Sequence, residues 1–302
     1  MNKPFSRSTF QFVPCRPFAM SSEQGAPRGR LMEGKRGLIM GVANDHSIAW
    51  GIAKTLCAHG AELAFTYQGE ALAKRVKPLA EQVGSEFLMP CDVEDIASVD
   101  AVFDAVRKQW GMMDFLVHAV AFSNKDELKG RYADTTRENF IKTMVISCYA
   151  FTESAKRAAA LMPNGGAMLT LTYNGGLRAM PNYNVMGVAK AGLEASVRYL
   201  AVDFGRQKIR VNAISAGPIR TLAGAGITDA RYMFAFQQKF SPLGRGVTLE
   251  ELGGAGLYLL SDLSTGVTGE VHFVDSGYNV IAMPRPDALK AAGATDSKDS
   301  AG

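Results

Sequence analysis

Two patterns of apolar residues alternate along most of the chain. Short, nearly continuous apolar runs, typical of strands buried on both faces, are followed by stretches in which apolar residues recur every three or four positions, as on helices. This alternation predicts an α/β fold with one doubly wound parallel sheet. The predicted strands span residues 35–41, 61–67, 85–93, 113–122, 166–173, 209–217 and 269–277. The predicted helices cover 48–60, begin near 70 and 96, and run near 136–162 and 183–206.

The pattern favours a single domain with two tails. No linker or internal repeat interrupts residues 32–283, a length that suits one domain. Residues 1–31 are rich in Ser, Pro and Arg and hold one acid, Glu23. That composition is typical of a disordered N-terminal extension, which we favour, and also of an organellar transit peptide. We expect residues 284–302 to form a flexible C-terminal tail.

The net charge of +4 comes from the N-terminal extension. Five of the 33 basic residues and one of the 29 acidic residues lie within residues 1–31, so the remainder carries 28 of each. A neutral body does not favour binding to nucleic acid. No apolar run approaches the roughly 20 residues of a membrane-spanning helix. We therefore expect neither a nucleic-acid nor a membrane partner, and a cytoplasmic location.

The cysteines and histidines are widely spaced along the sequence. No CxxC pair is present, and no histidine stands at ligand spacing from a cysteine. We expect reduced thiols and no metal site. The residues concerned are Cys15, Cys57, Cys91, Cys148, His46, His59, His118 and His272.

The first turn after a predicted strand suits a phosphate group. It begins at Gly41 and leads, through Ser47, into the helix that starts near Ile48. Free amides and the positive dipole end of a helix favour a pyrophosphate, and the Ser47 hydroxyl can add a donor. In an open parallel sheet this turn lies at the carboxyl edge, where ligands bind. The turn does not match GxGxxG, so a plain glycine turn is the alternative.

The ends of the second and third predicted strands indicate which dinucleotide would bind. Gln68 is neither the acid that often meets the ribose hydroxyls of NAD nor the basic residue that meets a 2′-phosphate, and we favour NADH. Asp92 could accept from an adenine amino group, with Val93 packed on the ring. A helix N-cap at Asp92 is the alternative.

A tyrosine and a lysine mark one face of the helix predicted near 183–206. Tyr183 and Lys190 are seven residues apart, which is within about 20° of two full turns and about 10 Å along the axis. A phenol and an ammonium therefore share a face. Alone, each is more often a packed aromatic or a solvated surface residue.

Several separated motifs together resemble the short-chain dehydrogenase/reductase superfamily. They are the turn 41–51, Asp92-Val93, the tyrosine and lysine pair, and NAISAGPIRTLA at 212–223. More narrowly, TYNGGLRAMPNYNVMGVAK at 172–190 and SAGPIRTLA resemble the bacterial NADH-dependent enoyl-acyl carrier protein reductase family of fatty acid biosynthesis. The resemblance implies a Rossmann-type fold, an oxidoreductase that uses NADH, an enoyl thioester substrate carried by acyl carrier protein, and a homotetramer.

The resemblance also implies roles for individual residues. The catalytic residues are Tyr173, Tyr183 and Lys190. The cofactor-binding residues are Gly41, Ser47, Ile48, Gln68, Asp92, Val93, Val120, Lys190, Ile219, Arg220, Thr221, Leu222 and Ala223. The substrate-binding residues are Ser123, Tyr173, Tyr183, Met186 and Ile227. The segment 224–240 is either a lid over the acyl pocket or an ordinary amphipathic helix, and the sequence does not decide between them.

The spacing of Tyr183 and Lys190 bears on the substrate. Ketone reductases of the superfamily have a Tyr-x3-Lys spacing, which would put the tyrosine at Met186, about 6 Å instead of about 10 Å from the lysine along the axis. A ketone accepts hydride on the carbon that bears the oxygen, whereas an enoyl thioester accepts it two carbons away. The longer spacing therefore favours hydride transfer to the β-carbon, with Tyr183 donating to the thioester oxygen and Lys190 holding the nicotinamide ribose and easing a phenolate.

Two other functions remain open at this point. A reductase of the same fold could act on a ketone or another activated alkene, although the tyrosine to lysine spacing argues against a ketone. A dinucleotide-binding sensor without turnover could also use this fold. The retained Tyr183 and Lys190 count against a sensor.

Overall fold

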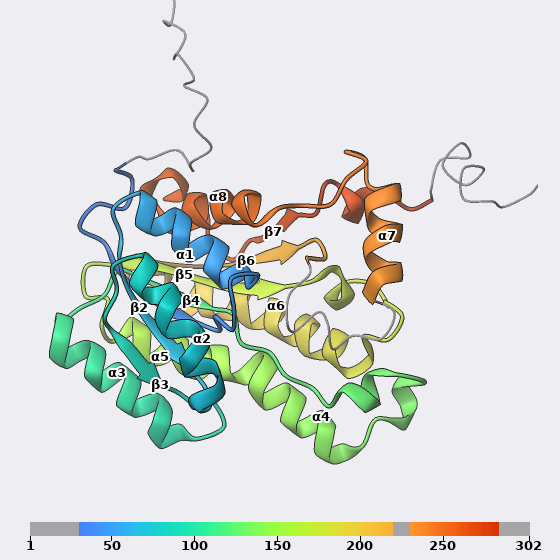
Figure 1. The fold of residues 1–302 in the computed structure, drawn as a ribbon, viewed down its shortest axis with the longest axis horizontal. Coiled ribbons are helices and arrows are strands. Elements are labelled where there is room, and N and C mark those ends of the chain that lie inside the picture. The colour runs from blue at the N-terminus through green and yellow to red at the C-terminus, as the bar shows by residue number, and fades with distance from the viewer. Residues whose placement is uncertain (1–29, 220–229, 284–302) are drawn as a thin grey trace, which may run out of the picture.

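The computed structural model describes residues 30–219 and 230–283, and it confirms the predicted α/β architecture (Figure 1). In this part of the chain, seven strands form one sheet in the order β3-β2-β1-β4-β5-β6-β7, and every neighbouring pair is parallel. The strands are β1 Arg36–Met40, β2 Glu62–Tyr67, β3 Leu88–Pro90, β4 Phe115–His118, β5 Gly166–Thr172, β6 Ile209–Ala216 and β7 Val271–Val274.

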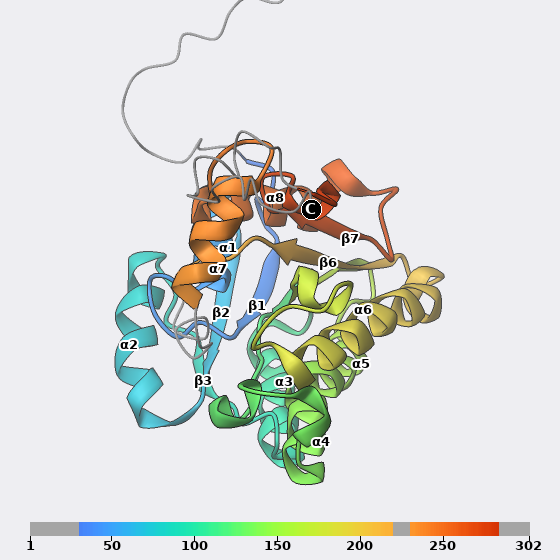
Figure 2. The same ribbon diagram turned by 90° about the vertical axis from the view of Figure 1, so that its right-hand side faces the viewer.

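Helices cover both faces of the sheet (Figures 1 and 2). Helices α1, α2 and α8 pack on one face, and α3, α5 and α6 pack on the other. The helices are α1 Ile48–Ala58, α2 Gly69–Gln82, α3 Ile96–Trp110, α4 Arg137–Met144, α5 Ala150–Ala159, α6 Asn184–Gly205, α7 Ala230–Phe240 and α8 Leu249–Leu260. Short helical turns lie at η1 Lys125–Leu128, η2 Tyr132–Asp134, η3 Val145–Tyr149, η4 Asn174–Gly176, η6 Asp262–Ser264 and η7 Tyr278–Val280.

Two helical regions differ from the prediction. The helix expected near 136–162 is divided into α4 and α5 by a π-helical turn, η3. Helix α8 was not predicted, because its glycines dilute the apolar pattern. A Cβ at Gly253 would lie 2.2 Å from the Thr55 hydroxyl oxygen, and one at Gly256 would lie 2.9 Å from Ile52. These glycines allow α8 to approach α1 closely.

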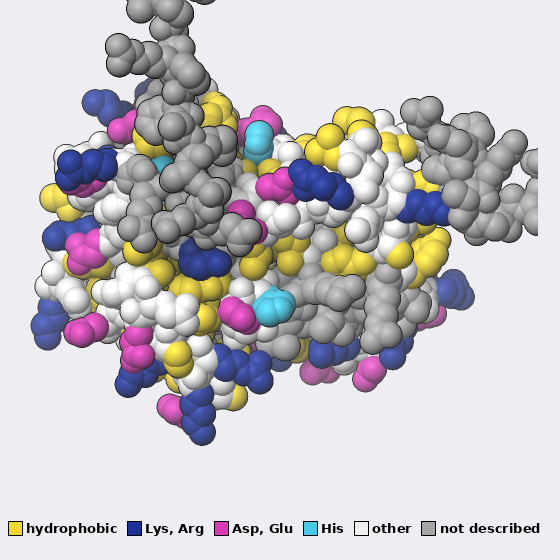
Figure 3. Space-filling model, turned by 45° about the horizontal axis from the view of Figure 1, so that its top comes forward, with side chains coloured by type: hydrophobic (Ala, Val, Ile, Leu, Met, Phe, Trp, Pro, Cys, Tyr) yellow, Lys and Arg dark blue, Asp and Glu magenta, His cyan; other side chains and the backbone are white. Residues whose placement is uncertain are grey.

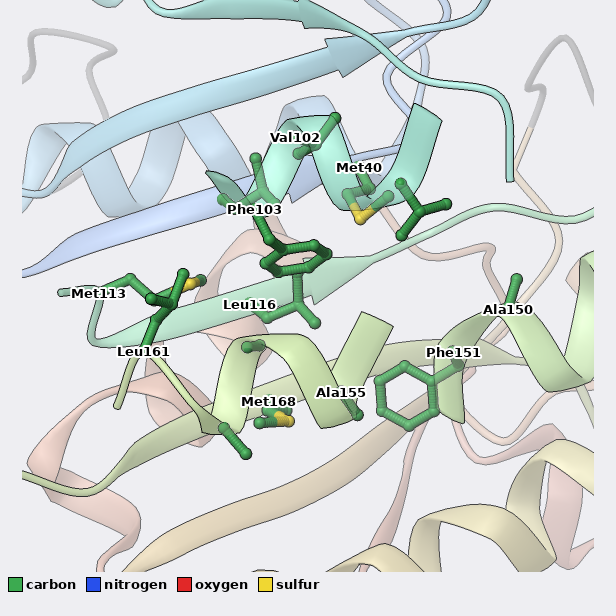
Figure 4. Packing of buried hydrophobic residues seen from close by; sticks show 14 of the residues in the cluster. Met40, Val102, Phe103, Met113, Leu116, Ala150, Phe151, Ala155, Leu161 and Met168 are labelled. Atoms are coloured by element: carbon green, nitrogen blue, oxygen red, sulfur yellow. The ribbon is translucent and has the colours of Figure 1, made fainter. Parts of the chain in front are cut away.

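The core on the α3, α5 and α6 side is built from large apolar side chains. Phe103 of α3 and Phe151 of α5 pack with Leu116 of β4 and Met168 of β5 (Figure 4). All four are at most 2% exposed. Complete burial of such a side chain contributes roughly 1.5–3 kcal/mol. The continuous apolar runs that predicted the strands therefore supply a two-sided core.

The strand order reverses between β1 and β4, which makes this the switch point of the sheet. The amide of Ala119, directly after β4, donates to the carbonyl of Met40 at 2.9 Å. Chains diverge to opposite faces from such a point and leave a crevice beyond the carboxyl ends of the strands. The predicted cofactor residues follow those ends.

Charged side chains of both signs are interspersed over the described surface that Figure 3 presents. Hydrophobic side chains also reach this face (Figure 3). Within residues 30–219 and 230–283, no helix combines the length and the apolar character that crossing a membrane requires.

Candidate active site

A cleft of about 350 Å³ opens at the switch point. Gly41 lines it with φ of 100°, and a Cβ at this position would lie 2.2 Å from the carbonyl oxygen of Ala119. Position 41 therefore requires glycine, both for its backbone conformation and for the close approach of the chain after β4. The cleft brings together further predicted cofactor residues, namely Gln68, Asp92, Val93 and Val120.

Ser47 shapes the turn that leads from β1 into α1. Its Oγ accepts hydrogen bonds from the amides of Ala43 and Asn44, at 3.0 and 3.1 Å, and makes no capping bond to the helix. The amides of Trp50 and Gly51 donate to the Ser47 carbonyl, whereas those of Ile48 and Ala49, at the very start of α1, precede any acceptor in the helix. This helix end supplies the donors and the dipole that suit a pyrophosphate, so the residues present fit a dinucleotide. A direct contact from the Ser47 hydroxyl stays a prediction.

Gln68 and Asp92 are joined across the ends of β2 and β3. The Gln68 Nε2 donates to the Asp92 Oδ2 at 3.1 Å, and the Asp92 Oδ1 accepts from the Glu94 amide at 3.0 Å. The N-cap of α3 is Asp95, whose carboxylate accepts from the Ala97 amide. The N-cap alternative for Asp92 is therefore wrong. Its carboxylate instead accepts from Gln68, the residue that directly follows β2.

Tyr183 occupies the N-cap position of α6. The asparagines on either side have positive φ, 55° at Asn182 and 36° at Asn184, a conformation that asparagine tolerates better than most residues. The Tyr183 side chain is only 7% exposed. Burial first, and then the neighbouring Tyr173 and Glu194, raise the pKa of this phenol above its ordinary value. This phenol is therefore neutral and able to donate a hydrogen bond, and the easing of a phenolate by Lys190 stays a prediction.

Lys190 lies two turns further along α6 and is also buried. Its Nζ donates to the carbonyl of Leu171, at the end of β5, over 2.9 Å. Burial lowers the pKa of Lys190 to about 8, whereas nearby Cys148 and Glu194 raise it. The ammonium form of Lys190 therefore depends on the groups around it.

Tyr173 directly follows β5 and packs against Tyr183. Its hydroxyl is buried and has no hydrogen-bond partner in the described part of the chain. Burial first, and then Tyr278 and Asp275, raise the pKa of Tyr173. An unpaired buried hydroxyl costs roughly 1–3 kcal/mol. Such a group is a candidate to meet a ligand.

The remaining predicted residues fall in three groups. Met186 packs beside Tyr183 in a small apolar cluster, and Ile219 lines a second cleft of about 280 Å³ next to α7. Ser123 is buried and accepts from the Thr143 hydroxyl at 2.8 Å, and it is not among the residues that line the switch-point cleft. Arg220, Thr221, Leu222, Ala223 and Ile227 lie outside the described residues. The lid prediction remains open, although its later part, α7, is a helix.

Sequence reasoning missed Glu194 of α6 and Thr172 of β5. The Thr172 hydroxyl donates to the Glu194 Oε1 at 2.6 Å, beside Lys190. Glu194 resembles any acid on a helix surface. The available signal was its spacing of four residues from Lys190, which places the two side chains on one face of α6.

No group of three or more histidine, cysteine, aspartate or glutamate residues in the described ranges could hold a metal ion. The three cysteines in those ranges, Cys57, Cys91 and Cys148, are free. Cys15 lies outside them. The buried His118 has a pKa lowered to about 3, chiefly by burial, and is therefore neutral.

Known proteins match this chain over nearly all of its described residues, including those of the candidate site. The family model described as enoyl-(acyl carrier protein) reductase matches residues 41–279. The enoyl-[acyl-carrier-protein] reductase [NADH] 2 of Rhizobium meliloti is 73% identical over 264 residues, covering 87% of this chain and 98% of the relative. The reductase FabI of Rickettsia typhi is 56% identical over 256 residues, covering 85% of this chain and 98% of that protein.

Solved structures give a consistent result. The enoyl-(acyl-carrier-protein) reductase of Anaplasma phagocytophilum, in complex with NAD, is 59% identical with a TM-score of 0.83, covering 85% of this chain and 98% of that one. FabI of Candidatus Liberibacter asiaticus is also 59% identical, with a TM-score of 0.84, covering 85% of this chain and all of that one.

Proposed function

The chain belongs to the enoyl-(acyl carrier protein) reductase family, and we propose that it catalyses the NADH-dependent reduction of the trans-2 double bond of enoyl-acyl carrier protein thioesters in fatty acid elongation. The observation that carries this function is the pair Tyr183 and Lys190, seven residues apart on α6. Both side chains are buried. Their spacing of seven residues is the one expected for an enoyl reductase, whereas ketone reductases of the superfamily have a spacing of four.

The chemistry divides between the cofactor and the residues of the chain. Bound NADH supplies the hydride that reduces the β-carbon of the enoyl thioester. The neutral Tyr183 phenol donates a hydrogen bond to the thioester oxygen, where negative charge develops as the reaction proceeds. A donor held in a buried site stabilises that charge without reorganising. Solvent supplies the proton that completes the α-carbon.

Lys190 holds the nicotinamide ribose hydroxyls with its ammonium group. The hydrogen bond to Leu171 fixes the direction of the Nζ and leaves its other protons for the ribose. The switch-point cleft takes the rest of the cofactor. The residues proposed to hold it are Gly41, Ser47, Ile48, Gln68, Asp92, Val93, Val120 and Ile219, together with Arg220, Thr221, Leu222 and Ala223, which lie outside the described residues. Since Gln68 offers no positive charge for a 2′-phosphate, we infer a preference for NADH over NADPH.

Tyr173 and the apolar residues near Tyr183 form the acyl side of the site. The unpartnered hydroxyl of Tyr173 orients the thioester, and Met186 and Ile227 contact the acyl chain, with Ser123 nearby. The buried cluster that contains Tyr183, Met186 and Tyr173 supports this proposal.

We also propose a homotetramer in the cytoplasm, with residues 32–283 as the reductase domain. The exposed face of α6 supports the assembly, since Tyr199 and Val202 are 77% and 79% exposed. Tyr199 and Val202 are three residues apart on α6 and therefore neighbours on its surface, and contiguous exposed apolar patches often mark interfaces between proteins. Residues 1–31 and 284–302 are proposed to be an N-terminal extension and a C-terminal tail outside that domain.

The function is tested by following NADH oxidation with crotonyl thioester and acetoacetyl thioester in parallel. We expect turnover of the crotonyl compound alone. Turnover of the acetoacetyl compound alone would identify a ketone reductase, and measurable NADH binding without turnover of either would identify a sensor.

A further inference from the structure

The carboxyl end of β5 is attached to α6 by two consecutive contacts. The carbonyl of Leu171 accepts from the Lys190 Nζ at 2.9 Å, and the hydroxyl of the next residue, Thr172, donates to the Glu194 Oε1 at 2.6 Å. Lys190 and Glu194 are one helical turn apart. The next residue on the strand side is Tyr173. The two contacts therefore fix Tyr173 relative to the helix that carries Lys190.

The Glu194 carboxylate sits in a close-fitting recess. A Cβ at Gly176, in the turn η4, would lie 2.8 Å from the Glu194 Oε1 and 3.1 Å from the amide nitrogen of Ala191. A residue larger than glycine at position 176 would therefore clash with the Glu194 carboxylate. Glu194 is only partly accessible to solvent, and its pKa is raised by burial, while Thr172, Arg198 and Lys190 act to lower it.

Three titratable groups from three elements face Lys190. They are Glu194 of α6, Cys148 of the π-helical turn η3, and His118 of β4. Burial raises the pKa of the Cys148 thiol above its ordinary value and lowers that of His118 to about 3. His118 is therefore neutral in the pH range in which Lys190 titrates, whereas burial favours the thiol form of Cys148 and the nearby Lys190 favours its thiolate. The neighbouring phenols, Tyr173 and Tyr183, also have raised pKa values and stay neutral.

Glu194 is then the one carboxylate, among the described residues, that acts on the charge of Lys190, beside the Cys148 thiol. We propose that Glu194 is a positioning residue that keeps Lys190 in its ammonium form at the pH of catalysis and fixes the strand end carrying Tyr173. This inference rests on the proposed function, in which the Lys190 ammonium binds the cofactor ribose. Glu194 does so without touching substrate or cofactor.

The test measures the dissociation constant of NADH by its fluorescence between pH 6.5 and 9.5. In the wild type the affinity falls as Lys190 loses its proton. In Glu194→Gln, the amide oxygen can still accept from Thr172, but the charge is removed, so Lys190 loses its proton more readily. We expect the pH at which affinity is half lost to move toward acid by about half a pH unit or more. The matched control is Glu81→Gln, which removes an acid from the exposed face of α2 and should leave the midpoint unchanged.

A second pair of variants separates charge balance from folding. Thr172→Val removes the hydrogen bond that lowers the pKa of Glu194, and should shift the midpoint in the same direction, whereas Thr172→Ser should restore the wild-type midpoint. If Glu194→Gln and Thr172→Val both bind NADH with the wild-type pH dependence, the inference is wrong. Failure of the proposed function can be distinguished from failure of this inference. If the wild type does not reduce crotonyl thioester, the pH dependence of its NADH binding can still be measured.

Discussion

Tyr173 and Tyr183 pack edge to face, with ring centroids 5.1 Å apart and an interplanar angle of 69°. One phenol follows β5 and the other begins α6, so the contact joins a strand end to a helix start. Edge-to-face rings of this kind stabilise each other by about 0.5–1.5 kcal/mol beyond burial. The contact therefore holds the two phenols beside each other at the proposed substrate position.

Replacing Tyr173 by phenylalanine should separate stability from activity. Because its hydroxyl is buried without a partner in the described residues, Tyr173→Phe should raise the free energy of unfolding by about 1 kcal/mol. It should also lower kcat with crotonyl thioester by about tenfold, since the hydroxyl is then missing for the thioester. Urea unfolding and steady-state kinetics measure the two effects. A variant that is less stable than wild type would argue that the hydroxyl has a partner within the protein.

Replacing Tyr183 by phenylalanine should remove the donor to the thioester oxygen. Loss of one such donor typically costs about a hundredfold or more in kcat. NADH affinity should be unchanged, because Lys190 and the cleft remain. Tyr258→Phe is the matched control, since Tyr258 is 36% exposed on α8, which packs on the opposite face of the sheet from α6. Full turnover by Tyr183→Phe would remove the role assigned to this phenol.

The adjacent glycines of α8 should respond oppositely to alanine. A Cβ at Gly253 would lie 2.2 Å from the Thr55 hydroxyl oxygen and 2.9 Å from the carbonyl oxygen of Gly51, whereas one at Gly254 meets nothing within 4 Å. Gly254→Ala should therefore stabilise the protein by about 0.5–1 kcal/mol through helix propensity. Gly253→Ala should destabilise it, because α8 must move away from α1. Thermal unfolding of the two variants decides this, and equal effects would contradict the packing of α1 on α8.

The buried ammonium of Lys190 should make stability depend on pH in a defined direction. The pKa of Lys190 is lowered in the folded protein from 10.5 to about 8, so between these values the unfolded chain binds more protons and folding gains stability as pH rises. Lys190→Met lacks this dependence. The unfolding free energy of the wild type minus that of Lys190→Met should therefore increase between pH 7.5 and 10, by at most about 3 kcal/mol. Lys54→Met, on the exposed side of α1, should show no such change.

Most of the fold could be predicted from sequence because a parallel sheet covered on both faces requires continuous apolar strands. The seven predicted strands appear in order, although β3, β4 and β7 are shorter than the runs that indicated them. Helix α8 was not predicted because glycines such as Gly253 interrupt its apolar pattern. These glycines are required by the close packing of α8 on α1, which is a tertiary contact that the local sequence does not show. The π-helical turn η3 leaves no mark on the apolar periodicity.

Residues of the candidate site could be predicted where the signal lies within one short segment of the sequence. Gly41 stands after a strand, and Tyr183 and Lys190 stand seven residues apart, so local spacing singled them out, and the resemblance to the reductase family supplied their predicted roles. The partnership of Thr172 with Glu194 joins residues 22 apart in sequence, and neither is unusual in its own segment. Asp92 looked equally suited to an N-cap until Asp95 was found in that position.

The most direct test of the central claim follows the fate of the hydride. Crotonyl thioester is reduced in ordinary water with NADH that carries deuterium at the transferable position of the nicotinamide, and the butyryl product is examined by mass spectrometry and NMR. If Tyr183 serves an oxygen two carbons away from the accepting carbon, one deuterium appears at the β-carbon and a solvent proton at the α-carbon. Deuterium at the α-carbon, or no reduced product, would contradict the account.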